Sequence, residues 1–246
     1  MRALCLFLVL SACSSPATDT ADDVDTEADT TPASSETLTL TARDGVSLVA
    51  DRFDAEGTAG VVLLHMTPSG PWNRSDWPDA FVQSLVDDGI SVVRIDRRGA
   101  GESGGEAEDA YLGEAGRYDV EAAVGALTEV GVTRLMLVGA SNGSTSLLDY
   151  AVWAPGEGLP SVQAFAMMSP GTYTENQNAI SALADVPGLL QFPANEATWP
   201  TELGAETTGG WTLTEYAGDA HGTNLFAADD AVATELHSFL VLSAGG

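Results

Sequence analysis

Short apolar runs alternate with helical patterns along most of this chain, and that alternation constrains its fold more than any other feature. Uninterrupted apolar runs are typical of strands that are covered on both faces. A regular succession of strand and helix gives right-handed crossovers and a parallel sheet with helices on both sides. The runs span residues 61–65, 91–95, 135–138, 164–168 and 188–192, and the helical patterns span 79–87, 118–130, 144–153 and 229–242. The sequence therefore predicts an α/β fold with a twisted, mostly parallel sheet.

Two further runs, 38–42 and 46–53, precede the parallel part and alternate apolar with polar residues. Residues 43–45, Arg-Asp-Gly, separate them, so the pair is expected to form an N-terminal antiparallel hairpin. A last strand is expected at 211–216. Fewer than twenty residues lie between the strands at 164–168 and 188–192, which is too few for a substantial lid domain.

The N-terminus predicts export. A positively charged start is followed by the apolar residues 3–10 and by the small residues Ser11 and Ala12, the pattern of a secretory signal peptide. The apolar run is too short to remain as a membrane span, which needs roughly 20 residues in a helix. Residues 1–12 are therefore expected to be cleaved off.

The segment that ends the signal, Leu-Ser-Ala-Cys at 10–13, resembles the bacterial lipobox, in which the Cys becomes the lipidated first residue. This implies a protein anchored in the cell envelope through Cys13. Ser14 in the next position resembles the pattern that favours the outer membrane. The alternative is an ordinary signal peptide that ends near a Cys. Because Cys5 leaves with the signal, no pair remains to form a disulfide.

Residues 14–36 contain almost nothing apolar, so they cannot bury enough surface to offset the entropy of ordering. Residues 13–36 are expected to be a lipidated Cys and a disordered acidic tether. The rest, 37–246, has the length of one α/β domain.

Charge and histidine content exclude several function classes. The net charge is −27, with nine Arg and no Lys, which repels the phosphates of nucleic acids. Three scattered His lack the spacing of a metal site, and no dinucleotide or P-loop motif stands between a strand and a helix. No metal and no cofactor are expected, and no oligomeric state is predicted.

One motif carries nucleophilic chemistry. Residues 139–143, Gly-Ala-Ser-Asn-Gly, match the Gly-x-Ser-x-Gly turn, in which a serine sits between a strand and a helix. Ser141 directly follows the strand at 135–138 and precedes a helical pattern. A second match centres on Ser103, but it stands several residues beyond its strand in a Gly- and Glu-rich stretch. We therefore assign Ser141 as nucleophile and Ser103 to a loop.

With the Ser141 turn and three other landmarks, the chain resembles the α/β-hydrolase superfamily. Within it, the chain is most similar to lidless esterases and dienelactone-hydrolase-like proteins. The other landmarks are the pair 65–66, the loop 96–103 and the late Ala-His-Gly at 220–222. The resemblance implies an oxyanion hole from the backbone N–H groups of Met66 and Asn142. It also implies that His65 orients a loop, and that Asp96 and Arg98 fix one as a pair.

A serine hydroxyl needs a neutral imidazole to accept its proton, and the chain offers His65, His221 and His237. His237 falls in the C-terminal helical pattern, whereas His221 follows the last strand in a Gly-bordered loop, in the superfamily's order of Ser, acid and His. His221 is therefore the expected general base.

The triad acid is expected at Glu196, shortly after the strand at 188–192, where the superfamily places it. Asp219 is the rival, but it stands only two residues before His221. Asp185 precedes the strand, at its wrong end for the site.

Two loop tryptophans, Trp72 and Trp77, are candidates for a substrate pocket, and the alternative for both is an anchor for their loop. Arg74 between them has two interpretations, a carboxylate receptor or a solvated surface charge. The function expected from these residues is that of a serine hydrolase acting on a small acyl substrate through an acyl-enzyme. The alternative is a catalytically silent ligand-binding module on the same fold.

The anchoring hypothesis predicts that Cys13→Ala abolishes incorporation of radiolabelled fatty acid and leaves unprocessed or soluble protein, because the lipidated thiol is gone. Metabolic labelling of the bacterial host checks this. Unchanged lipid labelling of the variant would refute the anchor.

Overall fold

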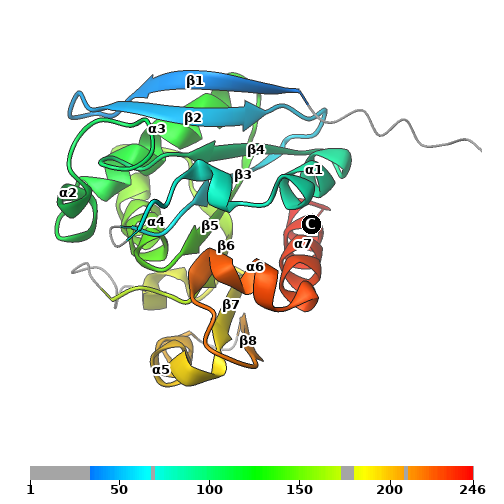
Figure 1. Ribbon diagram of the computed structural model, residues 1–246. Coiled ribbons are helices and arrows are strands. Elements are labelled where there is room, and N and C mark those ends of the chain that lie inside the picture. The colour runs from blue at the N-terminus through cyan, green and yellow to red at the C-terminus, as the bar shows by residue number, and fades with distance from the viewer. Residues whose placement is uncertain (1–33, 68–69, 173–179, 208–209, 246) are drawn as a thin grey trace, which may run out of the picture. The chain divides into compact units, whose positions relative to one another are not determined.

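Eight strands form one sheet in the computed structural model, which describes residues 34–67, 70–172, 180–207 and 210–245. The strands are β1 (Ser35–Thr41), β2 (Ser47–Phe53), β3 (Ala59–Leu64), β4 (Ile90–Ile95), β5 (Arg134–Ala140), β6 (Val162–Met168), β7 (Gly188–Pro193) and β8 (Trp211–Tyr216). Their order is β1-β2-β4-β3-β5-β6-β7-β8 (Figure 1). The β1–β2 and β2–β4 pairs are antiparallel and the other pairs are parallel. The predicted α/β-hydrolase fold, with its opening hairpin, is confirmed.

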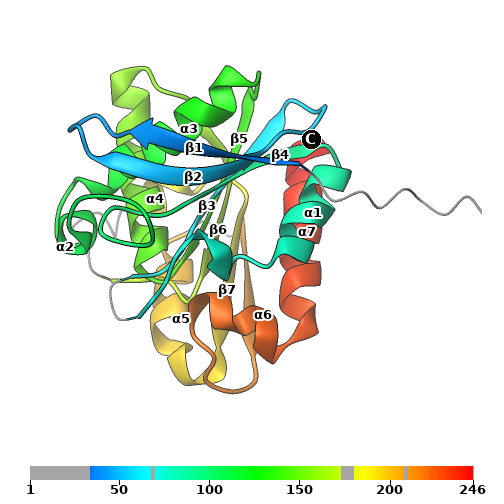
Figure 2. The ribbon, with the colours of Figure 1, turned by 45° about the horizontal axis from the view of Figure 1, so that its top comes forward.

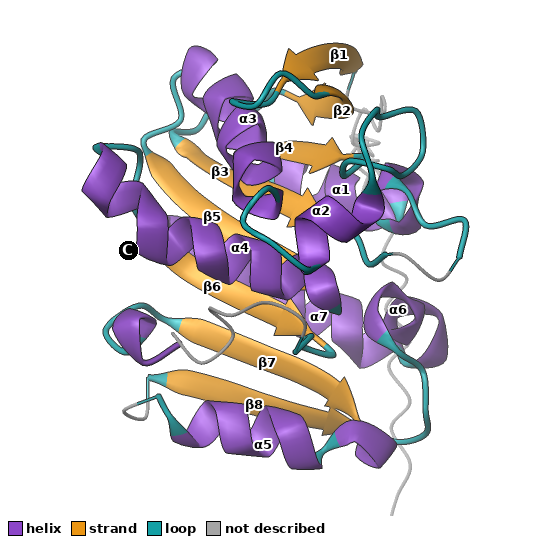
Figure 3. Cartoon of the chain, turned by 90° about the vertical axis from the view of Figure 1, so that its left-hand side faces the viewer, coloured by secondary structure: helices purple, strands orange, loops and turns teal. Residues whose placement is uncertain are grey.

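Helices cover both faces of the sheet. In the described residues they are α1 (Asp79–Asp87), α2 (Ala107–Tyr111), α3 (Gly116–Glu129), α4 (Asn142–Trp153), α5 (Thr198–Ala205), α6 (Leu225–Ala228) and α7 (Asp230–Gly245). Figure 3 shows α3 and α4 in front of the sheet, with α1 and α7 behind it. The four predicted helical patterns correspond to α1, α3, α4 and α7. The short helices α2, α5 and α6 are additional to the prediction.

The central strands are buried on both faces, as their uninterrupted apolar sequences predict. All six residues of β3 and all six of β4 are buried. Val62 and Leu64 pack in the core beneath α3 and α4, whereas Val61 and Leu63 pack in the core beneath α1 and α7. Burying one such side chain stabilises the fold by roughly 1.5–3 kcal/mol, so these strands form a rigid base for the loops at their ends.

The first strand begins earlier than expected. Ser35 pairs with Phe53 and Glu36 with Arg52, so β1 takes in two residues that were assigned to the tether. An ion pair of 2.8 Å between Glu36 and Arg52 supports this start. The expected signal peptide, Cys13 and most of the tether lie outside the described residues. Within the described part of the chain, no helix is both long and apolar enough to span a bilayer.

The topology brings six loops to one edge of the sheet. Because β3 to β8 are parallel, their carboxyl ends point the same way, and the twist of the sheet fans them apart (Figure 2). Ligand sites of open α/β sheets lie at this edge. It carries the residues that follow β3, β5, β6, β7 and β8, where the candidate residues stand.

Candidate functional site

Ser141 stands on a strained turn between β5 and α4. Its φ of 50° and ψ of −130° are unfavourable for any residue with a side chain, and such strain is concentrated at functional sites. Two glycines make room for the turn. A Cβ at Gly143 would lie 2.6 Å from the carbonyl oxygen of Leu64, and one at Gly139 would lie 2.7 Å from the amide nitrogen of Ser144. The motif's glycines are therefore required by packing.

Ser103, the second serine with a matching motif, lies in a loop as predicted. Its hydroxyl donates to the carbonyl of Asp96 at 2.6 Å and accepts from the amide of Val49 at 2.8 Å. These bonds join the loop after β4 to β2. The hydroxyl of Ser103 is thus committed to holding the loop.

His221 and Glu196 form a hydrogen-bonded pair. His221 follows β8, Glu196 follows β7, and the imidazole Nδ1 lies 2.7 Å from the carboxylate Oε1. A carboxylate only accepts, so Nδ1 carries the proton, and in the neutral ring Nε2 is then the basic nitrogen. Of the rival acids, Asp219 is exposed in the same loop, and Asp185 precedes β7 at the other end of the sheet.

The His221 loop passes close to the Ser141 turn. A Cβ at Gly222 would lie 3.5 Å from the Cβ of Ala140, the residue before Ser141. The amide of Gly222 donates to the hydroxyl of Ser169 at 2.9 Å. Ser169 directly follows β6 and also has a positive φ, of 47°. Sequence reasoning missed Ser169, and its place at the end of a parallel strand was the available signal.

Met66 and Asn142, the expected oxyanion donors, belong to two segments that are clamped together. The Asn142 side chain accepts from the amide of Thr67 at 3.0 Å through Oδ1, and donates to the carbonyl of Thr67 through Nδ2. A Cβ at Gly171 would lie 2.7 Å from the Asn142 nitrogen, so only a glycine fits beside that amide. The loop after β3 is thereby fixed against the first turn of α4.

His65 is fully buried beneath this loop. Its Nδ1 lies 2.7 Å from the carbonyl of Met66, and its Nε2 accepts from the amide of Arg97 at 3.0 Å. Burial, with the nearby charge of Arg97, lowers the pKa of His65 to about 3. The ring is therefore neutral with both nitrogens engaged, which suits the expected role of orienting the loop.

His237 lies on α7, where its Nε2 is 2.9 Å from the carboxylate of Asp88. Asp88 follows α1 directly, so the contact joins the two helices on one face of the sheet. Both residues stand away from the edge that holds Ser141.

The expected pair between Asp96 and Arg98 is wrong. Asp96 is fully buried and binds the backbone and side chain of Arg74. Arg98 instead binds Asp44 at 2.6 Å and Asp119 at 2.8 Å. The two side chains leave the β4 loop in different directions, Asp96 toward the loop 70–77 and Arg98 toward α3. Each fixes a separate segment beside the site.

Both interpretations of Arg74 are wrong as well. Its side chain is only 14% exposed, so it is not a solvated surface charge. It binds Asp51 at 3.1 Å and Glu102 at 2.7 Å in addition to Asp96, so its donors already have carboxylate partners. Arg74 is a structural bridge between β2 and two loops.

The two loop tryptophans have different environments. Trp77 is fully buried and packs edge-on to Phe226 at 5.9 Å between ring centroids, so it anchors its loop. Trp72 is half-buried, and its side chain lines two hollows. One, of about 370 Å³, extends from Thr67 to residues 99–101, and the other, of about 320 Å³, reaches Thr223 beside the His221 loop.

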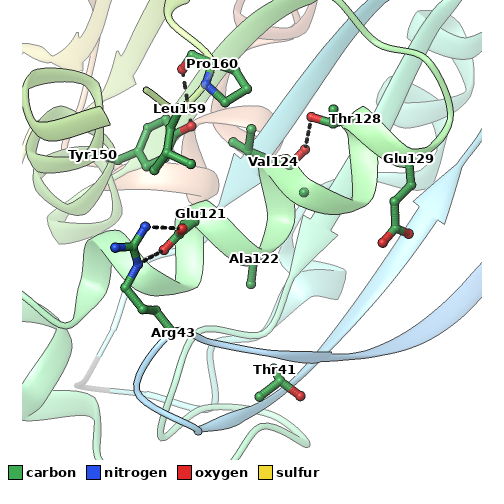
Figure 4. A pocket seen from close by; sticks show the side chains of 11 residues that line it. Thr41, Arg43, Glu121, Ala122, Val124, Thr128, Glu129, Tyr150, Leu159 and Pro160 are labelled. Atoms are coloured by element: carbon green, nitrogen blue, oxygen red, sulfur yellow. Dashed lines mark hydrogen bonds and ion pairs between the residues drawn. The ribbon is translucent and has the colours of Figure 1, made fainter. Parts of the chain in front are cut away.

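A larger hollow, of about 560 Å³, lies elsewhere. Figure 4 shows it between α3, the β1–β2 turn and the chain around Pro160, with the Arg43–Glu121 ion pair at its side. Its lining runs from Thr41 and Arg43 of the hairpin along α3 to Pro160 before β6. None of the candidate site residues lines it, whereas Trp72 lines both of the smaller hollows.

Metal ligation has no geometric support in the described ranges, where no group of three or more His, Cys, Asp or Glu side chains is arranged to hold an ion.

The family model described as serine aminopeptidase, S33, matches residues 58–221. Among solved structures, the Pyrococcus furiosus esterase Pf2001 is similar at 16% identity and a TM-score of 0.64, over 85% of this chain and 90% of that one. The esterase RhEst1 from Rhodococcus sp. is similar at 17% identity and a TM-score of 0.63, over 83% of this chain and 98% of its own. At these identities the likeness concerns the fold. No curated protein sequence matches the chain.

The lowered pKa of His65 predicts a pH dependence of stability. The folded protein keeps His65 neutral to about pH 3, whereas the unfolded chain protonates it near 6.5, so stability is lost as the pH falls between these values. The contribution approaches about 1.4 kcal/mol per pH unit. The free energy of unfolding, measured with urea across this pH range, should fall more steeply with decreasing pH for the wild type than for His65→Asn. Equal slopes would contradict the assignment.

Proposed function

The chain belongs to the family described as serine aminopeptidase, S33, and on that premise we propose that it is a serine hydrolase acting on a carboxylic ester, thioester or amide. Ser141 is the nucleophile, His221 the general base and Glu196 the acid that orients it. The substrate is a small acyl compound, and the reaction passes through an acyl-enzyme.

One observation carries the proposal. A strained serine and a hydrogen-bonded His221–Glu196 pair stand on loops at the same edge of the sheet, where Gly222 next to His221 lies close to Ala140 next to Ser141. Strain at Ser141 has no benefit for packing, and a pair whose side chains are 42% exposed at His221 and 29% exposed at Glu196 adds little stability. Catalysis accounts for both features.

The proposed reaction has two steps. The Ser141 hydroxyl oxygen attacks the carbonyl carbon while Nε2 of His221 takes the proton, and the carbonyl oxygen becomes an oxyanion. Collapse of this intermediate breaks the bond to the leaving group, which takes the proton from His221. Water then attacks the acyl-enzyme with His221 again as base, and the acid product leaves with Ser141 restored.

The N–H groups of Met66 and Asn142 are the proposed donors to the oxyanion. Such donors are worth several kcal/mol in the transition state when they are fixed beforehand. The double hydrogen bond between Asn142 and Thr67 supports this fixed geometry. The hollows on either side of Trp72 suit an acyl group on one side and a leaving group on the other.

The alternative is a silent binding module on the same fold. It requires neither the strained Ser141 nor the Glu196–His221 pair, so the enzyme is the better account. Burst release of a chromophore from an activated ester separates the two, because only an acyl-enzyme gives a burst.

We also propose that the enzyme is held at the bacterial cell envelope by a lipid on Cys13. The proposal rests on the lipobox resemblance at 10–13 and on the acidic, polar composition of the following residues. A membrane-tethered hydrolase would meet substrates that cross or leave the envelope.

A fluorophosphonate probe is expected to label the wild type and not Ser141→Ala, because the variant lacks the nucleophilic oxygen. Gel fluorescence and peptide mapping measure this. The matched control is Ser103→Ala, which loses two hydrogen bonds and about 1–3 kcal/mol of stability but should still label. Labelling of Ser141→Ala at another serine would overturn the assignment.

Glu196→Gln is expected to slow single-turnover acylation by an activated ester about 10²- to 10⁴-fold with the fold intact, because the imidazole loses its oriented tautomer. Asp219→Asn, a matched change in the His221 loop, should acylate at nearly the wild-type rate. If the two variants behave the other way round, Asp219 is the acid.

A further inference from the structure

Arg97 is a fully buried arginine whose hydrogen bonds go to uncharged oxygens. It follows β4, and none of its side chain is exposed. Nη1 donates to Oδ1 of Asn142 at 2.7 Å and to the carbonyl of His65 at 3.4 Å, and Nη2 donates to the hydroxyl of Ser146 at 2.8 Å. Its neighbour Arg98 takes the buried carboxylate of Asp119 instead.

Such an arrangement is costly. Burial of a cation without a paired anion costs several kcal/mol even after the protein relaxes, and its hydrogen bonds recover only part of this. Burial lowers the pKa of Arg97 to about 10, which still leaves the side chain charged at neutral pH. A hydrophobic residue at this position would favour stability, so the cation calls for another explanation.

The contacts of Arg97 lead to the oxyanion loop. Asn142 Oδ1 accepts from both Arg97 and the amide of Thr67, and Asn142 Nδ2 donates to the carbonyl of Thr67. The backbone amide of Arg97 donates to His65, whose other nitrogen faces the carbonyl of Met66. Arg97 therefore contacts both segments that supply the proposed oxyanion donors, one through Asn142 and the other through His65.

We propose that Arg97 is a positioning residue for the oxyanion hole, which holds the Asn142 side chain against the loop after β3 and places a buried positive charge behind the developing oxyanion. This inference rests on the proposed function. Arg97 contacts the oxyanion segments through Asn142 and His65, so we expect it to stabilise the transition state and not to bind the substrate.

Arg97→Met separates this role from a structural one. The two side-chain acceptors that lose Arg97 keep other partners, because the Ser146 hydroxyl still donates to the carbonyl of Ala110 at 3.2 Å and Asn142 still binds Thr67. The carbonyl of His65 loses only a long hydrogen bond of 3.4 Å, and the cost of the buried charge disappears. The variant should therefore melt at or above the wild-type temperature.

In steady-state assays with an activated ester, Arg97→Met should lower kcat by about 10- to 100-fold with KM little changed, because loosened donors act only in the transition state. The inhibition constant of a trifluoromethyl ketone, which forms an oxyanionic adduct with a serine, should rise by the same factor. Arg97→Lys, which keeps the charge, should recover part of the loss. Arg134→Met removes the same charge at the amino end of β5 and should leave kcat unchanged.

A double-mutant cycle tests the route through Asn142. Asn142→Ala keeps the backbone N–H and loses the side-chain amide. The fold-loss of kcat in the double variant with Arg97→Met should therefore be far smaller than the product of the two single fold-losses. Additive losses, or an Arg97→Met variant that is destabilised with unchanged kcat, would overturn the inference alone. Absence of Ser141-dependent turnover in the wild type would overturn the proposed function and the inference together.

Discussion

The backbone strain at Ser141 is the constraint on which the rest of the site depends. A φ of 50° persists only where the surroundings determine it, and here three strands do so. The amide of Ser141 donates to the carbonyl of Met168 on β6 at 2.8 Å, and Gly143 abuts the end of β3. Because β3, β5 and β6 are neighbours in the rigid centre of the sheet, the serine is held at a fixed point from which the β3 loop and the His221 loop take their positions.

Charge pairing organises the loops around that point. The chain has 36 acidic residues and nine Arg. Among the described residues most carboxylates are at least partly exposed, and the fully buried Asp96 and Asp119 are each paired with an Arg. Asp96 ties the Arg74 segment to the β4 loop, and Asp119 ties Arg98 to α3. Removing one member of such a buried pair typically costs 3–5 kcal/mol, because the other is left as an uncompensated charge. The loops beside the site are therefore rigid despite their irregular backbone.

The sequence predicted the sheet, the four long helices and the Ser141 turn because these follow from local apolar periodicity and glycine placement. It also placed Glu196, the carboxylate that pairs with His221, through its offset from β7. It could not predict which partner Asp96 or Arg98 takes, since both stand in one loop and only side-chain direction in space separates them. Trp77 was ambiguous for the same reason. The short helices α2, α5 and α6 lack the length that makes a helical period visible.

The contrast between net charge and local charge completes this picture. A net charge of −27 disfavours a negative charge on a bound intermediate. The influence of the exposed carboxylates in the described part of the chain is, however, screened within about 10 Å in dilute salt. Arg97 is buried, so its field is screened much less. At short range one enclosed cation therefore outweighs many solvated carboxylates. The proposed oxyanion site can thus be electropositive inside a strongly acidic protein, and its sign is set by the residues behind Asn142.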